Sequence, residues 1–266
     1  MTQRHMTTRV FFYLLCLLIL AGSCRRESIP DRAAKTARPA SSTSTSLWDE
    51  KRKQGIDFTA FGSTPAWSLD VDFAKNIRLK AQGNNVLTTS LPEPKPYGKN
   101  GGVLLDTKTG TGRLRITIEP AVCKDENGRE YAYSVVVEAN KKRYTGCGAF
   151  LRAENRLNDT WVLESFKGQR LRPELFSERQ LPYLAINVKD SRLEGYAGCN
   201  HIRGKVQTEA DQVQFEPVPA TRKACTSTFE SDFLNALRSA TLYRVGKNRL
   251  TLLSNGQYVM TFRKKN

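Results

Sequence analysis

Three residues of the C-terminal half have side chains that could bind a metal or act in nucleophilic catalysis: Cys199, His201 and Cys225. A structural zinc site normally uses four ligands, yet only three occur here and the chain has no Cys-x-x-Cys spacing. A catalytic Cys–His pair needs a free thiol. Because the N-terminal residues predict an oxidising compartment, the two cysteines are expected to pair with each other. The sequence therefore predicts a Cys199–Cys225 disulfide, and no catalytic residue, metal or cofactor.

Asn200 lies between Cys199 and His201, next to a glycine-rich stretch, and its side chain has two interpretations. Amides near glycines commonly cap turns or bind the local backbone. Asn200 could instead line a ligand groove together with Tyr196 and Arg203. The structural role is favoured, because asparagine is so common in turns.

Asp70 and Asp72 stand at alternate positions of a predicted strand, Trp67–Phe73. Alternate residues share one face of a strand, so a metal site or an acid–base pair is conceivable there. Since apolar neighbours occupy the other face, the two carboxylates are expected on the solvated face of a sheet.

The N-terminus predicts the compartment. A basic segment precedes an apolar run, Val10–Ala21, that is too short to span a bilayer comfortably. The following Ala21-Gly22-Ser23-Cys24 resembles the bacterial lipobox. The resemblance implies a lipoprotein signal peptide at residues 1–23, lipidation of Cys24, and membrane attachment in the cell envelope, with the periplasmic side of the outer membrane favoured. Residues 24–57 are polar and rich in Ser and Thr, which predicts a disordered tether.

Residues 58–152 show the alternating pattern of antiparallel strands separated by glycine-rich turns. Cys123 and Cys147 flank one of these strands and are expected to form a second disulfide. Pro120–Asp125 and Tyr144-Thr145-Gly146-Cys147-Gly148 resemble an uncharacterised bacterial periplasmic lipoprotein domain, which often has Glu-Pro-Phe-Trp where this chain has Thr64-Pro65-Ala66-Trp67. The resemblance implies no known activity.

Residues 158–266 predict further hairpins and one helix. Ser227 with Glu230 fits a capping box, and the apolar residues after it recur on one helical face. The predicted fold class is mainly β, or α+β. It has two small antiparallel β-barrel-like domains, the C-terminal one with a single packed amphipathic helix.

The C-terminal domain resembles the META family of HslJ-like heat-shock and lipoprotein domains. The resemblance rests on a set of residues in the family's order: Trp161, Leu163, Gly195-Tyr196-Ala197-Gly198-Cys199-Asn200, Gly204, Thr221, Ala224-Cys225, Glu230, Leu250, Leu252 and Gly256. Members of this family are associated with stress response and novobiocin resistance, without an agreed molecular mechanism. The resemblance therefore implies a category of protein and not a reaction.

The formal net charge of +16 is spread along the whole chain, without a nucleic-acid-binding motif, so no nucleic-acid partner is expected. The favoured function is a non-enzymatic envelope lipoprotein that supports stress tolerance by binding an envelope protein or a small ligand. An alternative is a periplasmic inhibitor of a cell-wall hydrolase such as lysozyme. The positive charge weighs against it, because lysozymes are usually cationic. A weaker alternative is an unrecognised hydrolase.

Overall fold

The computed structural model describes residues 47–81, 85–176 and 178–265, all within one compact unit of the chain. The predicted signal peptide, Cys24 and the tether up to residue 46 lie outside these residues. Among the described residues, no helix has the length and apolar character needed to cross a membrane.

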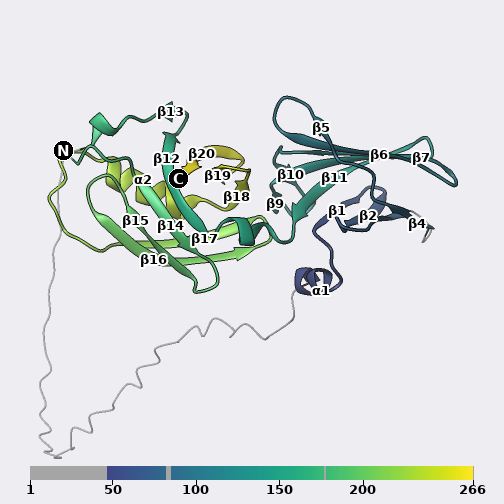
Figure 1. The fold of residues 1–266 in the computed structure, drawn as a ribbon, viewed down its shortest axis with the longest axis horizontal. Coiled ribbons are helices and arrows are strands. Elements are labelled where there is room, and N and C mark those ends of the chain that lie inside the picture. Colours follow the sequence, from purple (N-terminus) through teal and green to yellow (C-terminus); the bar gives the residue numbers. More distant parts are fainter. Residues whose placement is uncertain (1–46, 82–84, 177, 266) are drawn as a thin grey trace, which may run out of the picture. The chain divides into compact units, whose positions relative to one another are not determined.

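The N-terminal domain is an open, nine-stranded antiparallel half-barrel (Figure 1). Its order is β4-β3-β2-β1-β11-β10-β7-β6-β5. A two-stranded hairpin of β8 and β9 stands apart from this sheet. The strands are β1 (Phe58–Ser63), β2 (Ala66–Val71), β3 (Asn76–Ala81), β4 (Asn85–Ser90), β5 (Lys95–Tyr97), β6 (Gly102–Thr109), β7 (Gly112–Glu119), β8 (Cys123–Lys124), β9 (Glu130–Tyr131), β10 (Tyr133–Ala139) and β11 (Lys142–Phe150).

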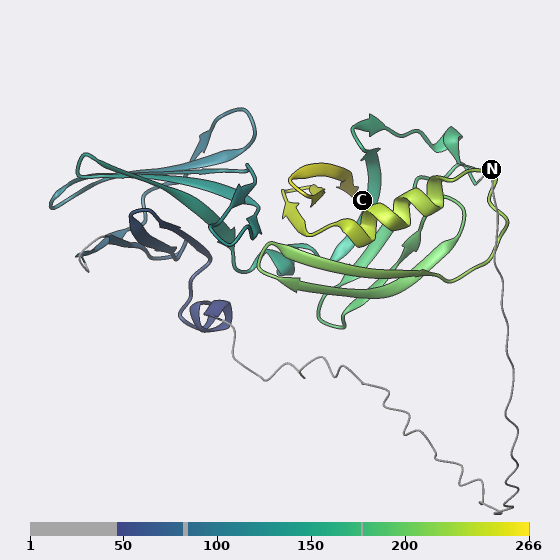
Figure 2. The ribbon, with the colours of Figure 1, turned by 180° about the vertical axis from the view of Figure 1, so that it is seen from behind.

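The C-terminal domain closes into an eight-stranded barrel, because β12 pairs with both β14 and β20 (Figure 2). The elements are η2 (Ala153–Arg156), β12 (Asp159–Phe166), β13 (Gln169–Arg170), η3 (Pro173–Leu175), β14 (Tyr183–Asn187), β15 (Arg192–Tyr196), β16 (His201–Glu209), β17 (Gln212–Pro219), α2 (Phe229–Ser239), β18 (Leu242–Val245), β19 (Arg249–Ser254) and β20 (Gln257–Lys264). The short β13 pairs with β12 outside the closed ring. This architecture confirms the predicted fold class.

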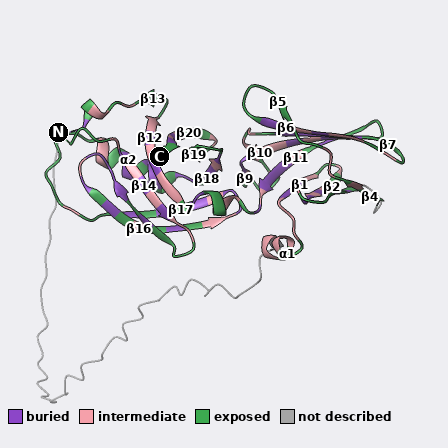
Figure 3. Ribbon diagram, viewed as in Figure 1, coloured by how far each residue is buried: buried purple, intermediate pink, exposed green. Residues whose placement is uncertain are grey.

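Alternation of apolar and polar residues decides which side of each strand is buried. Buried and exposed residues alternate along β16 and β17, as Figure 3 shows by colour. Helix α2 buries Phe233, Leu234, Ala236 and Leu237 in the barrel core, which confirms the packed amphipathic helix. Gly204 is required on β16, because a Cβ there would lie 2.2 Å from the carbonyl oxygen of Glu216 on β17.

The predicted tether extended too far towards the N-terminal domain. Residues Leu47–Lys53 form helix α1, which is docked on the half-barrel. Arg52 Nε donates to the carbonyl oxygen of Leu151 at 2.7 Å, and Lys51 forms an ion pair with Asp70. Trp48 packs against a small apolar cluster. These contacts stabilise a helix that is too short to form by itself.

The prediction of a solvated face for both carboxylates was wrong for Asp72, whose side chain is buried. Asp72 Oδ1 accepts the backbone N–H of Ala74 at 2.8 Å, and its carbonyl oxygen accepts those of Lys75 and Asn76. Asp72 therefore organises the turn before β3. Asp70 is half-buried and accepts a hydrogen bond from Thr59 as well as pairing with Lys51.

The tip of the β16–β17 hairpin joins the two domains. Ala210 and Asp211 are 2% and 1% exposed, because Ala210 packs against Tyr131, Ala149 and Leu151 of the N-terminal domain. Asp211 Oδ2 accepts the backbone N–H of Ala132. We call this contact the hairpin joint.

Candidate binding site at the junction of the two domains

Both predicted disulfides are confirmed. Cys123 bonds to Cys147 and Cys199 to Cys225, with Cα–Cα distances of 5.3 and 5.9 Å. The sulfur atoms of Cys199 and Cys225 lie near the carboxylate of Glu230, all within 4.8 Å of one another. Because metal binding and nucleophilic attack both require a thiolate, a disulfide in these positions cannot provide them.

His201 does not join this cluster. It is exposed at the start of β16, where its ring lies 5.5 Å from that of Tyr196. Among the described residues, His201 is the only histidine and every cysteine is bonded to another. No Cys–His pair is therefore formed in this part of the chain.

Asn200 is buried, and its side chain connects two segments to the disulfide. Its Oδ1 accepts the Thr221 hydroxyl and the Lys223 backbone N–H, both at 2.8 Å. Its Nδ2 donates to Cys225 Sγ and to Glu230 Oε1, both at 3.2 Å. This network supports the structural interpretation of Asn200.

Glu230 has a different role from the one predicted. The expected capping box with Ser227 is wrong, since α2 begins after Thr228 and has no side-chain cap. The carboxylate of Glu230 instead accepts the backbone N–H of Asn200 at 2.6 Å. Residue spacing alone could not distinguish a local cap from this contact across the domain.

The structure does not support a ligand groove at Tyr196, Asn200 and Arg203. Tyr196 is 0% and Asn200 3% exposed, whereas Arg203 is exposed on β16. Tyr196 and Asn200 are thus parts of the packed interior.

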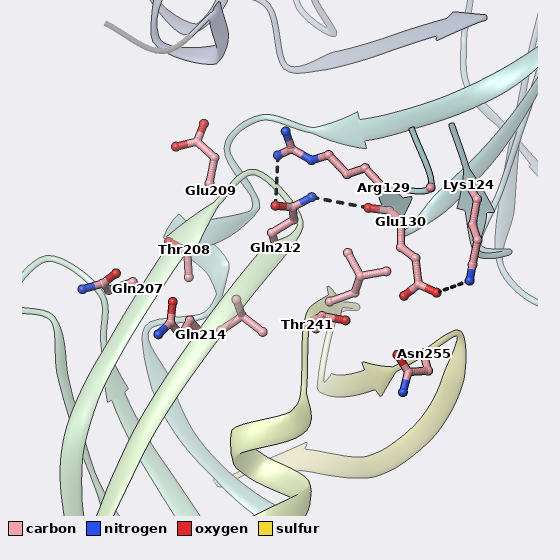
Figure 4. Close-up of a pocket in the computed structure, with 13 residues that line it drawn as sticks. Lys124, Arg129, Glu130, Gln207, Thr208, Glu209, Gln212, Gln214, Thr241 and Asn255 are labelled. Carbon is pink, nitrogen blue, oxygen red and sulfur yellow. Dashed lines mark hydrogen bonds and ion pairs between the residues drawn. The ribbon is translucent and has the colours of Figure 1, made fainter. Parts of the chain in front are cut away.

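A hollow of about 680 Å³ lies instead beside the hairpin joint (Figure 4). We call it the amide hollow. The C-terminal domain contributes the outward side chains of β16 and β17, and the N-terminal domain contributes β8 and β9. Its lining residues are Lys124, Gly128, Arg129, Glu130, Gln207, Thr208, Glu209, Gln212, Val213, Gln214, Thr241, Leu242 and Asn255.

The register of the β16–β17 hairpin explains how four of these polar side chains come together. Gln207 pairs with Gln214, and Glu209 with Gln212, across β16 and β17. Side chains two residues apart point to the same side of a strand, so all four project from the outer face of the barrel. Figure 4 shows them on the two strands that run towards the N-terminal domain.

Two hydrogen bonds cross the hollow between the domains, and one ion pair lies within its N-terminal wall. Arg129 Nη2 donates to Gln212 Oε1 at 2.9 Å, and Gln212 Nε2 donates to the carbonyl oxygen of Glu130 at 3.4 Å. Lys124 Nζ lies 3.2 Å from Glu130 Oε1 (Figure 4). Gln212 therefore contacts two residues of the neighbouring domain.

A second hollow, of about 570 Å³, shares Arg129 and Glu209 with the first. We call it the aromatic hollow, because Trp48, Phe61 and Tyr131 line it. The rings of Phe61 and Tyr131 meet edge to face at 5.1 Å, and the Arg129 guanidinium carbon lies 5.6 Å from the Tyr131 ring centre. Arg129 thus stands at the boundary of both hollows.

The hairpin joint contains a buried carboxyl group. Burial raises the pKa of Asp211 to about 7. The hydrogen bond from Ala132 and the charges of Arg129 and Arg244 lower this pKa, but burial has the larger effect. Burial also raises the pKa of the nearby Tyr133 to about 12. Arg244 Nε donates to the carbonyl oxygen of Ala132 at 2.9 Å, so both backbone groups of Ala132 bind the C-terminal domain.

Sequence reasoning did not identify these hollows. The pattern Gln207-x-Glu209 and Gln212-x-Gln214 around a two-residue turn could have predicted polar side chains clustered on one face of a hairpin. The opposite wall of the hollow could not be predicted from the sequence, because Lys124, Arg129 and Glu130 lie next to the hairpin only when the two domains are docked.

Comparison with known proteins identifies the class of the C-terminal half. The META domain family matches residues 154–266, so this part of the chain is a META domain. No curated protein matches the chain.

Two solved structures share limited similarity. One, described only as an NMR structure, has 19% identity and a TM-score of 0.35, covering 43% of this chain and 96% of its own. The other is a crystal structure of a DUF4847 family protein from Bacteroides vulgatus. It has 16% identity and a TM-score of 0.32, covering 42% of this chain and 98% of its own.

Proposed function

We propose that the protein is a non-enzymatic cell-envelope lipoprotein that binds an envelope component where its two domains meet. The observation that carries this proposal is the amide hollow, which is built by side chains of both domains beside a buried joint. Its volume falls in the range of small-molecule sites, about 300–1,000 Å³. A binding role also accounts for the two-domain architecture, since neither domain forms the hollow alone.

The envelope location rests on the lipobox-like segment ending at Cys24 and on the two disulfides, which persist in oxidising compartments. The N-terminal domain's resemblance to periplasmic lipoprotein domains is consistent with the same location. The META family's association with stress response makes stress tolerance the expected benefit of binding. A lipid at Cys24 would keep the site within reach of the envelope.

Binding to detergent-solubilised envelope extract tests the proposal. Full-length protein is immobilised, and the extract's association is measured by biolayer interferometry. Gln214→Trp places a bulky ring in the amide hollow and is expected to reduce the signal about tenfold. Gln169→Trp, on exposed β13 and outside the residues that line the hollow, is the matched control. Equal binding by both variants, or no binding by the wild type, would contradict the proposal.

A further inference from the structure

We propose that the ligand is a neutral, polyhydroxylated glycan that spans the amide hollow and the aromatic hollow. This inference rests on the proposed function, because it names the ligand class of the same site. It follows from three properties: balanced charge in the amide hollow, side chains there that both donate and accept hydrogen bonds, and aromatic rings in the adjoining hollow.

The charges of the amide hollow cancel, although the chain as a whole carries a formal net charge of +16. Lys124 and Arg129 contribute two positive charges, and Glu130 and Glu209 contribute two negative ones. Lys124 is paired with Glu130 across 3.2 Å. A site for an anionic ligand would show an excess of cations. This balance favours a neutral ligand.

The amide hollow is rich in groups that match hydroxyls. Gln and Asn amides offer both donors and acceptors, as do Thr hydroxyls, so they complement hydroxyl groups in either direction. Gln207, Gln214, Thr241 and Asn255 are exposed around the hollow, available to a ligand. Figure 4 shows Asn255, from the turn between β19 and β20, facing the side chain of Glu130. The carboxylate of Glu130 adds an acceptor for sugar hydroxyls.

The aromatic hollow supplies the complementary apolar surface. Sugar rings have C–H faces as well as hydroxyl edges, and aromatic side chains pack against such faces while their large area stabilises the contact. Trp48 and Phe61 are half-buried and line this hollow. Since the two hollows meet at Arg129 and Glu209, a chain of linked sugars can place rings in one and hydroxyls in the other.

Isothermal titration calorimetry of the full-length protein in detergent micelles tests this inference. The probe is the tetramer of N-acetylglucosamine, which is neutral and carries hydroxyl and acetamido groups. We expect saturable binding, weakened about tenfold or more by Gln214→Ala and by Trp48→Ala, which corresponds to about 1.4 kcal/mol. Gln207→Ala is a second amide variant, and all variants are first checked for native NMR dispersion.

Matched controls keep the test specific. Gln169→Ala and Tyr97→Ala replace the same kinds of side chain outside both hollows and are expected to change affinity less than about twofold. The glucosamine tetramer, the galacturonic acid tetramer and an acetylated, amidated alanine tetrapeptide serve as cationic, anionic and peptide probes. Preferential binding of any of these three overturns the neutral glycan. Failure of every glycan, with extract binding still lost in Gln214→Trp, overturns the glycan and leaves the binding function standing.

Discussion

At the residue scale, Asn200 is the side chain on which the disulfide end of the META domain depends. It bonds Thr221, Lys223, Cys225 and Glu230, which belong to a loop and to the first turn of α2. A buried polar network of this kind is costly to break, because removing one member leaves its partners unsatisfied.

Asn200→Ala should therefore lower the free energy of unfolding by about 2–4 kcal/mol. The measurement is urea denaturation at neutral pH with both disulfides intact. The control Asn127→Ala removes an exposed amide and should change stability by less than about 0.5 kcal/mol. If the two substitutions have equal effects, Asn200 does not hold this region together.

Asp211 makes the hairpin joint sensitive to pH. Its pKa is about 7 in the folded chain and about 3.9 in an unfolded one. The folded state therefore binds the proton more tightly than the unfolded state. This contribution to stability is fully present below the unfolded pKa, and is lost as the pH rises through about 7.

Asp211→Asn should remove this pH dependence, because asparagine can still accept the N–H of Ala132 but does not titrate. Between pH 5 and pH 8 the wild type is expected to lose about 1–3 kcal/mol more stability than the variant. Glu93→Gln, an exposed neutralisation, is the control and should follow the wild-type profile. Parallel profiles for wild type and Asp211→Asn would show that Asp211 does not couple folding to protons.

At the element scale, local patterning predicted antiparallel strands in both domains and the packed helix, and the expected oxidising compartment predicted both disulfides. Two of the elements that were missed depend on tertiary contacts. Helix α1 has only seven residues and is held by Arg52 and Lys51, and β18 is a strand of only four residues. Tertiary contacts also explain why the hollows were not predicted. Side chains from two domains form them, and the spacing of residues in the sequence does not show how those domains pack together.

The β16–β17 hairpin is the element that joins the domains, so a charge at its tip should separate them. Ala210→Glu places a carboxylate among Tyr131, Ala149 and Leu151, where it has no cation to pair with in the apolar cluster. We expect a larger radius of gyration by small-angle X-ray scattering and faster proteolysis between residues 151 and 158. The control Ala121→Glu is exposed and should leave both unchanged. An unaltered scattering curve for Ala210→Glu would mean that the tip does not hold the joint.

At the scale of the whole molecule, the hairpin joint and the two hollows depend on the same contact between the domains. The hairpin tip is buried in the N-terminal domain, and the polar side chains just before and after it form the wall of the amide hollow. Binding in the hollow and docking of the domains should therefore reinforce each other, because a ligand that contacts both walls binds only the docked state.

Hydrogen–deuterium exchange of the full-length protein, with and without solubilised envelope extract, tests this account most directly. Added extract should slow exchange in peptides covering residues 128–131 and 207–214 together, and Gln214→Trp should abolish that protection. Protection confined to other segments, with both of these peptides unchanged, would contradict a binding site between the domains.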